Sequence, residues 1–296
     1  MKKAFVLAET ADNARELSAG ARTIGAEEVV LVTLGEAPEA CADKVIRITV
    51  PDGAVADDAA ETVIGLVDAE EPEAILVEST RALKTIAGKL AHHAGTAAMT
   101  GVMAIEGESA RNLYYGGVAE RLQKAIEGPS IYVVAPGVFE GAEPSGSGMV
   151  EEAAWVAPAA PLALCSSTPI TRSGVDLNKA DAVVAAGRGF SSKAELDLAR
   201  ALSEKIGGSL GCTRPLTEGE CWLPTEIYIG VSGLMLSPKV YIAAGISGQM
   251  QHMVGCNRSG TIFAINKDEN APIFKQCDFG LVGDVKDVLP ALVAAL

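Results

Sequence analysis

The sequence predicts an α/β protein built from two domains. Segments typical of strands and helices alternate over residues 3–93, and the same alternation begins again at residue 181. Hydrophobic residues make up 49% of the 296 residues but aromatic residues only 4%, so the core must be built mainly from Ala, Val, Ile and Leu, as in packed layers of helix and sheet. Because a strand, a helix and a strand in succession favour parallel pairing, we expect largely parallel sheets.

The N-terminal alternation consists of β-branched runs separated by amphipathic segments. In the first expected helix, Leu17, Ala21 and Ile24 recur near helical spacing, and Thr80 is a candidate cap for the last one. The expected strands are Lys3–Ala8, Glu28–Leu34, Lys44–Val50 and Ala74–Val77, and the expected helices are Asn13–Gly25, Asp57–Val67 and Thr80–His93.

The pattern changes after residue 100, where long helices are no longer expected. Three strands joined by short turns are expected at Gly101–Glu106, Asn112–Val118 and Ser130–Pro136. Residues 141–150 are rich in Gly, Pro and Ser and indicate a loop, and the three prolines of Val156–Thr171 indicate an extended connector. We therefore place the boundary near Ser173–Asn178, between an N-terminal domain of residues 1–175 and a C-terminal domain of residues 176–296.

The C-terminal domain opens with a buried strand at Asp181–Ala186, and an amphipathic helix is expected at Ser192–Ile206. Its closing helix contains Pro290, which favours a kink. The remaining expected elements are the strands Ser209–Thr213, Val240–Ile246 and Thr261–Ile265 and the closing helix Val285–Leu296.

The net charge of the chain limits the classes of partner that it can bind. The formal net charge of −14 argues against nucleic acid and anionic membranes. Residues 1–175 carry −12 of this charge and residues 176–296 only −2, so the C-terminal domain is better suited to an anionic ligand. No apolar run reaches the roughly 18 residues that span a bilayer. The apolar stretch near the N-terminus ends at Glu9 and is a poor signal peptide, so we expect a cytoplasmic protein without membrane insertion.

Cysteine and histidine give no indication of a metal site. The six cysteines include no C-x-x-C pair, which zinc ribbons and iron–sulfur clusters usually need, so we expect reduced and mostly buried thiols. His92 and His93 have no nearby ligand partners and are expected to be surface or packing residues. His252 follows a strand-end turn, where it can face either a ligand or the core.

Small and polar residues follow four segments of the C-terminal domain, at the expected ends of strands. In an open parallel sheet, ligands bind outside the carboxyl ends of the strands, and glycine there lets backbone N–H groups approach a phosphate. An isolated arginine in such a neutral setting usually needs an anion. The four turns are Gly187-Arg188-Gly189, Cys212-Thr213-Arg214, Gly230-Val231-Ser232-Gly233 and Gly245-Ile246-Ser247-Gly248.

Known nucleotide and hydrolase motifs are incomplete in this sequence. The run from Gly187 to Ser192 begins like G-x-G-x-x-G but lacks the third glycine, and no G-x-x-x-x-G-K-[ST] loop is present. Residues 207–211 match G-x-S-x-G, but they lead from a helix into a strand, the reverse of a nucleophile elbow. The residues themselves therefore predict a ligand site without defining the ligand.

The strand-end turns and the segments around them resemble the FAD-binding domain of the electron transfer flavoprotein α subunit. The N-terminal part is similar more loosely, through Tyr115–Gly117, and Trp222 with residues 230–236 resembles the branch that includes the FixB proteins and the carnitine-pathway α subunit. The segments that carry the resemblance are Gly187–Gly189, Thr213–Arg214, Gly245–His252, Ala264–Asp268, Ala271–Phe274 and Asp278–Gly280.

The resemblance implies a nucleotide-hydrolase-like α/β domain that docks a β subunit, followed by a Rossmann-like parallel-sheet domain that binds FAD. Arg188 and the backbone of Ser247–His252 would hold the phosphate and ribityl region, and Arg214 would lie over the isoalloxazine ring beside Thr213. Ser232 would lie near flavin N5 and His252 near the pyrimidine end. The implied FAD-binding residues are Arg188, Thr213, Arg214, Ile229, Gly230, Val231, Ser232, Ser247, Gly248, Gln249, Met250, Gln251, His252, Asn266, Asp284 and Val285, of which Asn266, Asp284 and Val285 would serve the adenosine half.

Two departures from the family pattern concern residues 229–231. Val231 stands where many relatives carry Gln, and the segment between Arg214 and Ser232 is one residue longer.

The chemistry of the other implied site residues fits an electron carrier, because a guanidinium is always charged and stabilises a reduced, anionic flavin relative to the oxidised form. A protonated His252 would add to this effect, and the Ser232 hydroxyl can donate or accept at N5.

The expected function is that of the α subunit of a heterodimeric electron transfer flavoprotein. Its expected donors are acyl-CoA dehydrogenase-type flavoproteins, and its expected acceptor is a quinone oxidoreductase or a ferredoxin. Two alternatives stay open at this point. A stand-alone flavin- or NAD-dependent oxidoreductase would have only His252 for proton transfer, and a nucleotide-binding regulatory module would have no redox role.

Overall fold

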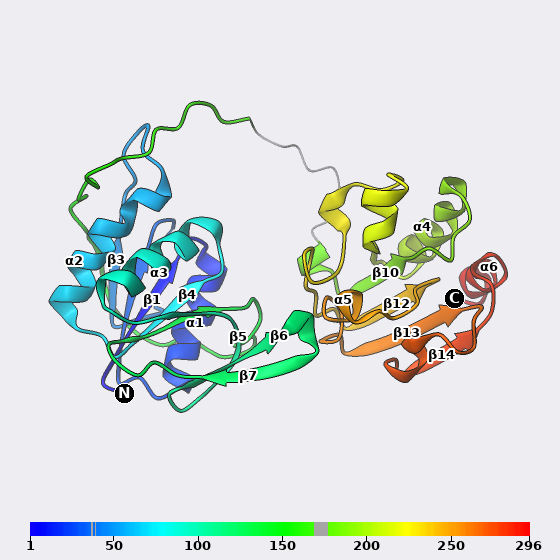
Figure 1. Cartoon of the computed structure of the whole chain (residues 1–296), viewed down its shortest axis with the longest axis horizontal. Helices are drawn as coiled ribbons and strands as arrows, with labels where there is room; N and C mark the ends of the chain where they lie inside the picture. Colours follow the sequence, from blue (N-terminus) through cyan, green and yellow to red (C-terminus); the bar gives the residue numbers. More distant parts are fainter. Residues whose placement is uncertain (37, 39, 169–176) are drawn as a thin grey trace. The chain divides into compact units, whose positions relative to one another are not determined.

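The computed structural model describes residues 1–36, 38, 40–168 and 177–296. These residues form two compact units, one of residues 1–114 and 120–168 and the other of residues 115–119 and 177–296 (Figure 1). The predicted boundary between residues 175 and 176 lies outside the described residues, as do the last residues of the predicted connector Val156–Thr171.

The N-terminal unit is built on a sheet that has, within the described residues, nine strands in the order β7-β6-β5-β8-β4-β1-β2-β3-β9. Neighbouring strands from β9 to β5 pair in parallel, and β5 pairs with β6 in antiparallel fashion. The strands are β1 Lys3–Ala8, β2 Glu28–Thr33, β3 Lys44–Arg47, β4 Ala74–Glu78, β5 Ala98–Glu106, β6 Ser109–Tyr114, β7 Ala119–Gln123, β8 Ser130–Val134 and β9 Val150–Glu152.

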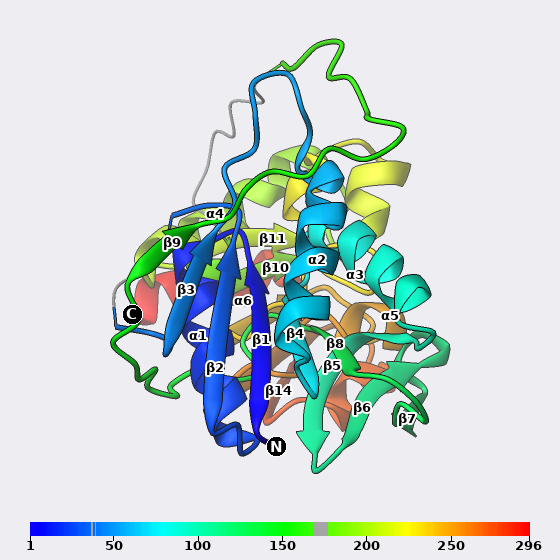
Figure 2. The same cartoon turned by 90° about the vertical axis from the view of Figure 1, so that its left-hand side faces the viewer.

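Helices cover both faces of this sheet, which confirms the predicted α/β layers. Figure 2 shows helix α1 (Ala11–Thr23) on one face and helices α2 (Ala60–Glu70) and α3 (Arg81–His93) on the other. Side chains alternate along each strand, so Ala4 and Val6 pack in the core with α1, while Phe5 and Leu7 pack in the core with α2 and α3. The predicted cap of α3 is confirmed, because the Thr80 hydroxyl accepts a hydrogen bond from the Leu83 N–H at 3.2 Å.

The N-terminal predictions fail at the edges of the sheet. Strands β7 and β9 were not predicted, because both are short and lie at the ends of the strand order, where no two-sided burial marks their sequence. The strand predicted at Asn112–Val118 ends at Tyr114, and the chain turns through Gly116 and Gly117, whose φ angles of 65° and 92° lie in the left-handed region that glycine adopts most readily.

The C-terminal unit is a parallel sheet whose described strands follow the order β11-β10-β12-β13-β14. Helices α4 (Leu196–Lys205) and α6 (Val285–Ala295) pack together on one face, and α6 continues through Pro290. The strands are β10 Ala182–Ala186, β11 Ser209–Cys212, β12 Val240–Ala244, β13 Thr261–Asn266 and β14 Phe279–Val282. Strand β14, another exposed edge strand, was not predicted.

The strand order of the C-terminal unit creates a switch point between β10 and β12. The chain leaves β10 toward β11 on one side, whereas the strands that follow lie on the other side. At such a point the loops beyond the carboxyl ends of two adjacent strands diverge and leave a crevice, which is where open α/β sheets bind ligands. Among the described residues, no helix has the length and apolarity needed to cross a membrane.

Candidate cofactor site

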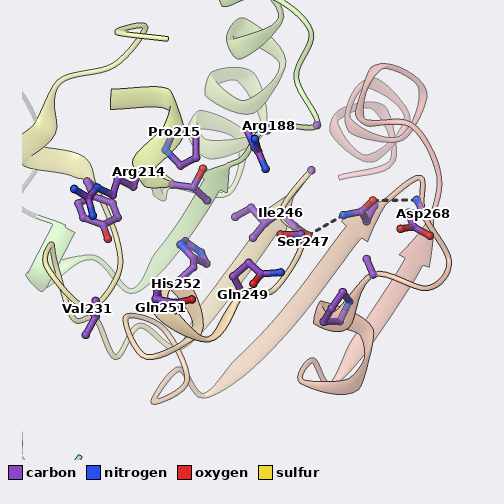
Figure 3. A pocket seen from close by; sticks show the side chains of 17 residues that line it. Arg188, Arg214, Pro215, Val231, Ile246, Ser247, Gln249, Gln251, His252 and Asp268 are labelled. Atoms are coloured by element: carbon purple, nitrogen blue, oxygen red, sulfur yellow. Dashed lines mark hydrogen bonds between the residues drawn. The ribbon is translucent and has the colours of Figure 1, made fainter. Parts of the chain in front are cut away.

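A cavity of about 510 Å³ opens at the carboxyl ends of β10 to β13, at this switch point. Its volume lies within the range of roughly 300–1,000 Å³ that is typical of small-molecule and cofactor sites. Figure 3 shows Arg188, Arg214, Ser247 and His252 around it; Arg188 follows β10, Arg214 follows β11, and Ser247 and His252 both follow β12. The lining residues are Arg188, Gly189, Thr213, Arg214, Pro215, Tyr228, Val231, Gly245, Ile246, Ser247, Gln249, Gln251, His252, Asn266, Asp268, Ala271 and Pro272.

Two glycines bring the loops after β10 and β12 into direct contact at the base of the cavity. The Gly189 N–H donates to the Gly245 carbonyl at 2.9 Å. A Cβ on Gly189 would lie 2.5 Å from the Gly245 Cα, and a Cβ on Gly245 would lie 2.7 Å from the Gly189 Cα. Gly245 also has a φ of 65°. No other residue fits this contact, which explains why both turns carry glycine.

The two predicted arginines differ in how the chain holds them. Arg188 is exposed, and within the described part of the chain its side chain has no hydrogen bond or ion pair. Arg214 is fixed by Glu218, whose Oε2 accepts from its Nε at 2.7 Å, and this carboxylate raises the pKa of Arg214. The cavity therefore has one unpaired guanidinium at the β10 turn and one oriented guanidinium at the β11 turn.

Thr213 carries a polar atom that nothing in the described residues satisfies. Its backbone N–H donates to the Ala186 carbonyl at 3.0 Å, which extends the β10–β11 pairing by one residue. Its Oγ1 is buried without a partner, although the residue lines the cavity. Because an unpaired buried hydroxyl costs roughly 1–3 kcal/mol, this atom is best explained by a ligand that supplies the missing hydrogen bond.

His252 lines the cavity, but both of its ring nitrogens are used inside the protein. Nδ1 lies 3.0 Å from the Ile229 carbonyl, which can only accept, so Nδ1 carries a proton. Nε2 lies 2.8 Å from the Tyr241 hydroxyl. Burial lowers the pKa of His252 to about 4, so the ring is neutral at pH 7 and Nε2 accepts from Tyr241. A protonated ring, the condition under which His252 would add positive charge to the site, is therefore not met at pH 7.

Asn266 and Gly248 fix the loop after β12. The Asn266 Nδ2 donates to the Ile246 carbonyl at 2.8 Å, and its Oδ1 accepts from the Asp268 N–H at 3.0 Å. Gly248, with a φ of 82°, approaches Ile273 so closely that a Cβ would lie 2.4 Å from the Ile273 nitrogen. The side-chain amide of Asn266 thus connects the loop after β12 with the loop after β13, and both loops form part of the wall of the cavity.

The cavity brings together many of the predicted residues but not all of them. The predicted residues that line it are Arg188, Thr213, Arg214, Val231, Ser247, Gln249, Gln251, His252 and Asn266. The predicted residues outside its lining are Ile229, Gly230, Ser232, Gly248, Met250, Asp284 and Val285. Of these, Val285 packs in the core and Asp284 caps α6 by accepting from the Lys286 N–H at 3.1 Å. Contacts of these outer residues with FAD stay a prediction.

Sequence reasoning missed several lining residues, of which Tyr228 is the largest. Tyr228 forms a bridge with Cys212, so the irregular segment after β11 returns to the sheet exactly where the cavity opens. Pro215 was missed because it opens a short helical turn, Pro215–Gly219, that the sequence pattern did not indicate. A short apolar run that includes Tyr228 and Ile229 is the signal that could have indicated a return to the sheet.

Both units of this chain match family models built from known proteins. Residues 6–159 match the model of the electron transfer flavoprotein domain, and residues 176–257 match that of the electron transfer flavoprotein FAD-binding domain. Protein FixB of Salmonella typhi is 39% identical over an alignment of 305 positions, which covers 99% of this chain and 97% of the relative. The chain belongs to the electron transfer flavoprotein α-subunit family. Protein FixB of Escherichia coli O81 is 41% identical over 228 residues, which cover 75% of this chain and 73% of the relative.

This membership confirms the resemblance seen in the sequence, and FAD is the cofactor of the C-terminal unit. The site fits that cofactor on its own geometry: the cavity lies at the switch point, the glycines allow close approach, and the Thr213 hydroxyl and the Arg188 guanidinium lack partners among the described residues. FAD supplies the redox chemistry when it is bound. The residues of the chain bind it, orient it and place positive charge beside it.

Replacing Thr213 by valine is expected to weaken FAD binding without destabilising the chain. The hydroxyl has no described partner to lose, so removing it deprives only the ligand of a hydrogen bond, and we expect Kd for FAD to rise about fivefold, equivalent to about 1 kcal/mol. Titration of the apoprotein with FAD and thermal unfolding measure the two effects.

Thr217→Val is the matched control for this substitution. The Thr217 hydroxyl is also buried, but it donates to the Arg214 carbonyl at 2.9 Å, so its loss should lower thermal stability. Thr213→Val with unchanged FAD affinity and lowered stability would show that Thr213 is part of the core and not of the site.

Proposed function

We propose that this chain is the FAD-carrying subunit of a heterodimer with an electron transfer flavoprotein β subunit. It takes electrons from acyl-CoA dehydrogenase-type flavoproteins and passes them to a quinone oxidoreductase or a ferredoxin. The main support for this proposal is that both units match electron transfer flavoprotein domains. A second support is the cavity, where the buried Thr213 hydroxyl has no partner in the described chain. The N-terminal domain, residues 1–175, docks the β subunit, and residues 176–296 bind FAD.

In this proposal each side chain has a task that its position supports. Arg188, which no described residue neutralises, pairs with the phosphates, and the backbone of residues 247–252 holds the ribityl region. Arg214, held by Glu218, directs its charge toward the flavin ring. No side chain of the cavity has to act as a nucleophile or base, which agrees with the neutral, internally hydrogen-bonded His252.

Co-expression with the β subunit tests the proposal. We expect a yellow heterodimer whose flavin is reduced when an acyl-CoA dehydrogenase and an acyl-CoA are both added, but not by the acyl-CoA alone. The chain purified without the β subunit should be unstable or poor in flavin, and a stable, FAD-saturated monomer would contradict the heterodimer.

The same experiment separates the two alternatives. Turnover of a small substrate by the isolated chain would favour a stand-alone oxidoreductase. A colourless complex after reconstitution with FAD and the β subunit would favour a regulatory module without a redox role.

A further inference from the structure

A continuous line of buried hydrogen bonds runs from the core of the C-terminal unit to the wall of the cavity. Tyr241 lies on β12 and is fully buried, and His252 is 7% exposed. The Tyr241 hydroxyl meets His252 Nε2 at 2.8 Å, and His252 Nδ1 meets the Ile229 carbonyl at 3.0 Å. The line therefore joins a strand of the sheet to the loop that carries Val231 into the cavity.

The donors in this line follow from the carbonyl at one end and from the neutral His252 ring. The Ile229 carbonyl can only accept, so His252 Nδ1 donates to it. With Nδ1 protonated and the ring neutral, Nε2 is an acceptor, and the Tyr241 O–H must point at it. Burial raises the pKa of the neighbouring Cys256 thiol to about 12, so this thiol keeps its proton and donates to the His252 carbonyl, with Sγ 3.9 Å from the oxygen.

The Ile229–Gly233 segment is held by this line and by the sheet, where the Ile229 N–H donates to the Cys212 carbonyl at 2.9 Å. Apart from the His252 bond to the Ile229 carbonyl, the segment is tied to the helix α5 region (Met250–Met253) by the Val231 N–H, which donates to the Gln251 carbonyl at 2.8 Å. Gly230 has a φ of 149°, and a Cβ there would lie 2.7 Å from the Gln251 carbonyl oxygen, so the segment lies directly against the backbone that precedes His252. If the His252 ring turns, the segment loses one of its two attachments to this region.

We propose that Tyr241 is a positioning residue of the FAD site: its hydroxyl fixes the tautomer and orientation of His252, and through the Ile229 carbonyl it holds the Ile229–Gly233 wall of the cavity. Tyr241 is not among the residues that line the cavity and acts only through His252. The inference rests on the FAD site described above, but its central claim concerns hydrogen bonds inside the chain. It can therefore fail while the electron-carrier proposal stands, and the reverse also holds.

The first test is nitrogen NMR of the heterodimer in which only this chain is labelled with ¹⁵N-histidine. The sequence contains only three histidines, so the ring signals can be assigned by substituting His92 and His93 in turn. At pH 7 we expect His252 to show a protonated Nδ1 and an unprotonated, hydrogen-bonded Nε2. A His252 with its proton on Nε2, or with both nitrogens protonated, would overturn the proposal without the need for any variant of Tyr241.

The second test is Tyr241→Phe in the heterodimer. The substitution removes one neutral hydrogen bond from Nε2, and we expect the Nε2 signal to lose its hydrogen-bonded shift and Kd for FAD to rise about fivefold. In a His252→Gln background the same substitution should have no further effect on Kd, because Tyr241 acts through the ring. An equal effect in both backgrounds, or an unchanged Kd in Tyr241→Phe alone, would refute the positioning role.

Tyr132→Phe is the matched control. Tyr132 is likewise fully buried on a strand, β8 of the N-terminal unit, and its hydroxyl donates to the Glu108 carbonyl at 3.0 Å. This variant should lose a similar amount of stability while the His252 signals and the FAD affinity stay unchanged. If Tyr132→Phe weakened FAD binding as much as Tyr241→Phe, the effect would reflect general destabilisation, and the proposal would be rejected.

Discussion

Gly245→Ala is expected to abolish high-affinity FAD binding and to destabilise the C-terminal unit by about 3 kcal/mol. Of this loss, roughly 1–2 kcal/mol comes from placing a side chain at a positive φ and the remainder from overpacking. The added Cβ would lie 2.7 Å from the Gly189 Cα, which is backbone and cannot move aside like a flexible side chain. The loops after β10 and β12 must then separate, and the base of the cavity is lost. Chemical denaturation and FAD titration measure the two effects.

Gly207→Ala is the control for the conformational part of this effect. Gly207 has a φ of 63°, almost equal to the 65° of Gly245, but no atom lies within 4 Å of its hypothetical Cβ. The Gly207→Ala substitution should therefore lower the free energy of unfolding by about 1 kcal/mol and leave the FAD affinity unchanged. Equal effects of the two substitutions would show that the Gly189–Gly245 contact has no special role.

Arg214→Ala should lower the midpoint potential of the bound flavin, by on the order of 30 mV, which corresponds to a tenfold change in the equilibrium constant of a two-electron couple. The guanidinium is permanently charged, and in the proposed site it stabilises the reduced flavin more than the oxidised one. Its orientation is set by the hydrogen bond from Nε to Glu218. Redox titration of the heterodimer measures the shift.

Two further variants separate the charge of Arg214 from its shape and from binding in general. Arg214→Lys keeps the positive charge, so the midpoint potential of the bound flavin should stay close to that of the unsubstituted protein. Arg188→Ala removes a charge from the proposed phosphate end, so it should weaken FAD binding with little change in potential. An unchanged potential in Arg214→Ala would show that this arginine does not face the flavin ring.

The central strands could be predicted because burial on both faces leaves continuous apolar runs. Strand β1 and strand β10 each have a neighbouring strand on both sides, and both were predicted to within one residue. The edge strands β7, β9 and β14 have only one neighbour and exposed side chains, so their sequences resemble loops. Pairing with a distant strand, and not a local preference, makes them strands.

The site could be predicted in outline for a similar reason. Arg188, Thr213 and Arg214 were singled out because they follow strands of a parallel sheet, and topology alone gathers such ends at one edge. Tyr228 and Tyr241 were missed, because the first lies in an irregular segment and the second is a core residue on a strand. Their roles depend on atoms from segments that are distant in sequence.

The amino-acid sequence by itself determined the order of helices and strands, the family and the kind of side chains that meet the cofactor, since these follow from local periodicity and from motifs. The tertiary structure alone decided that Gly189 and Gly245 touch, that the Thr213 hydroxyl is unpaired among the described residues and that His252 is neutral. The physical reason is that hydrogen-bond pairing and the desolvation of a titratable group depend on every atom around them, and those atoms come together only when the sheet is assembled.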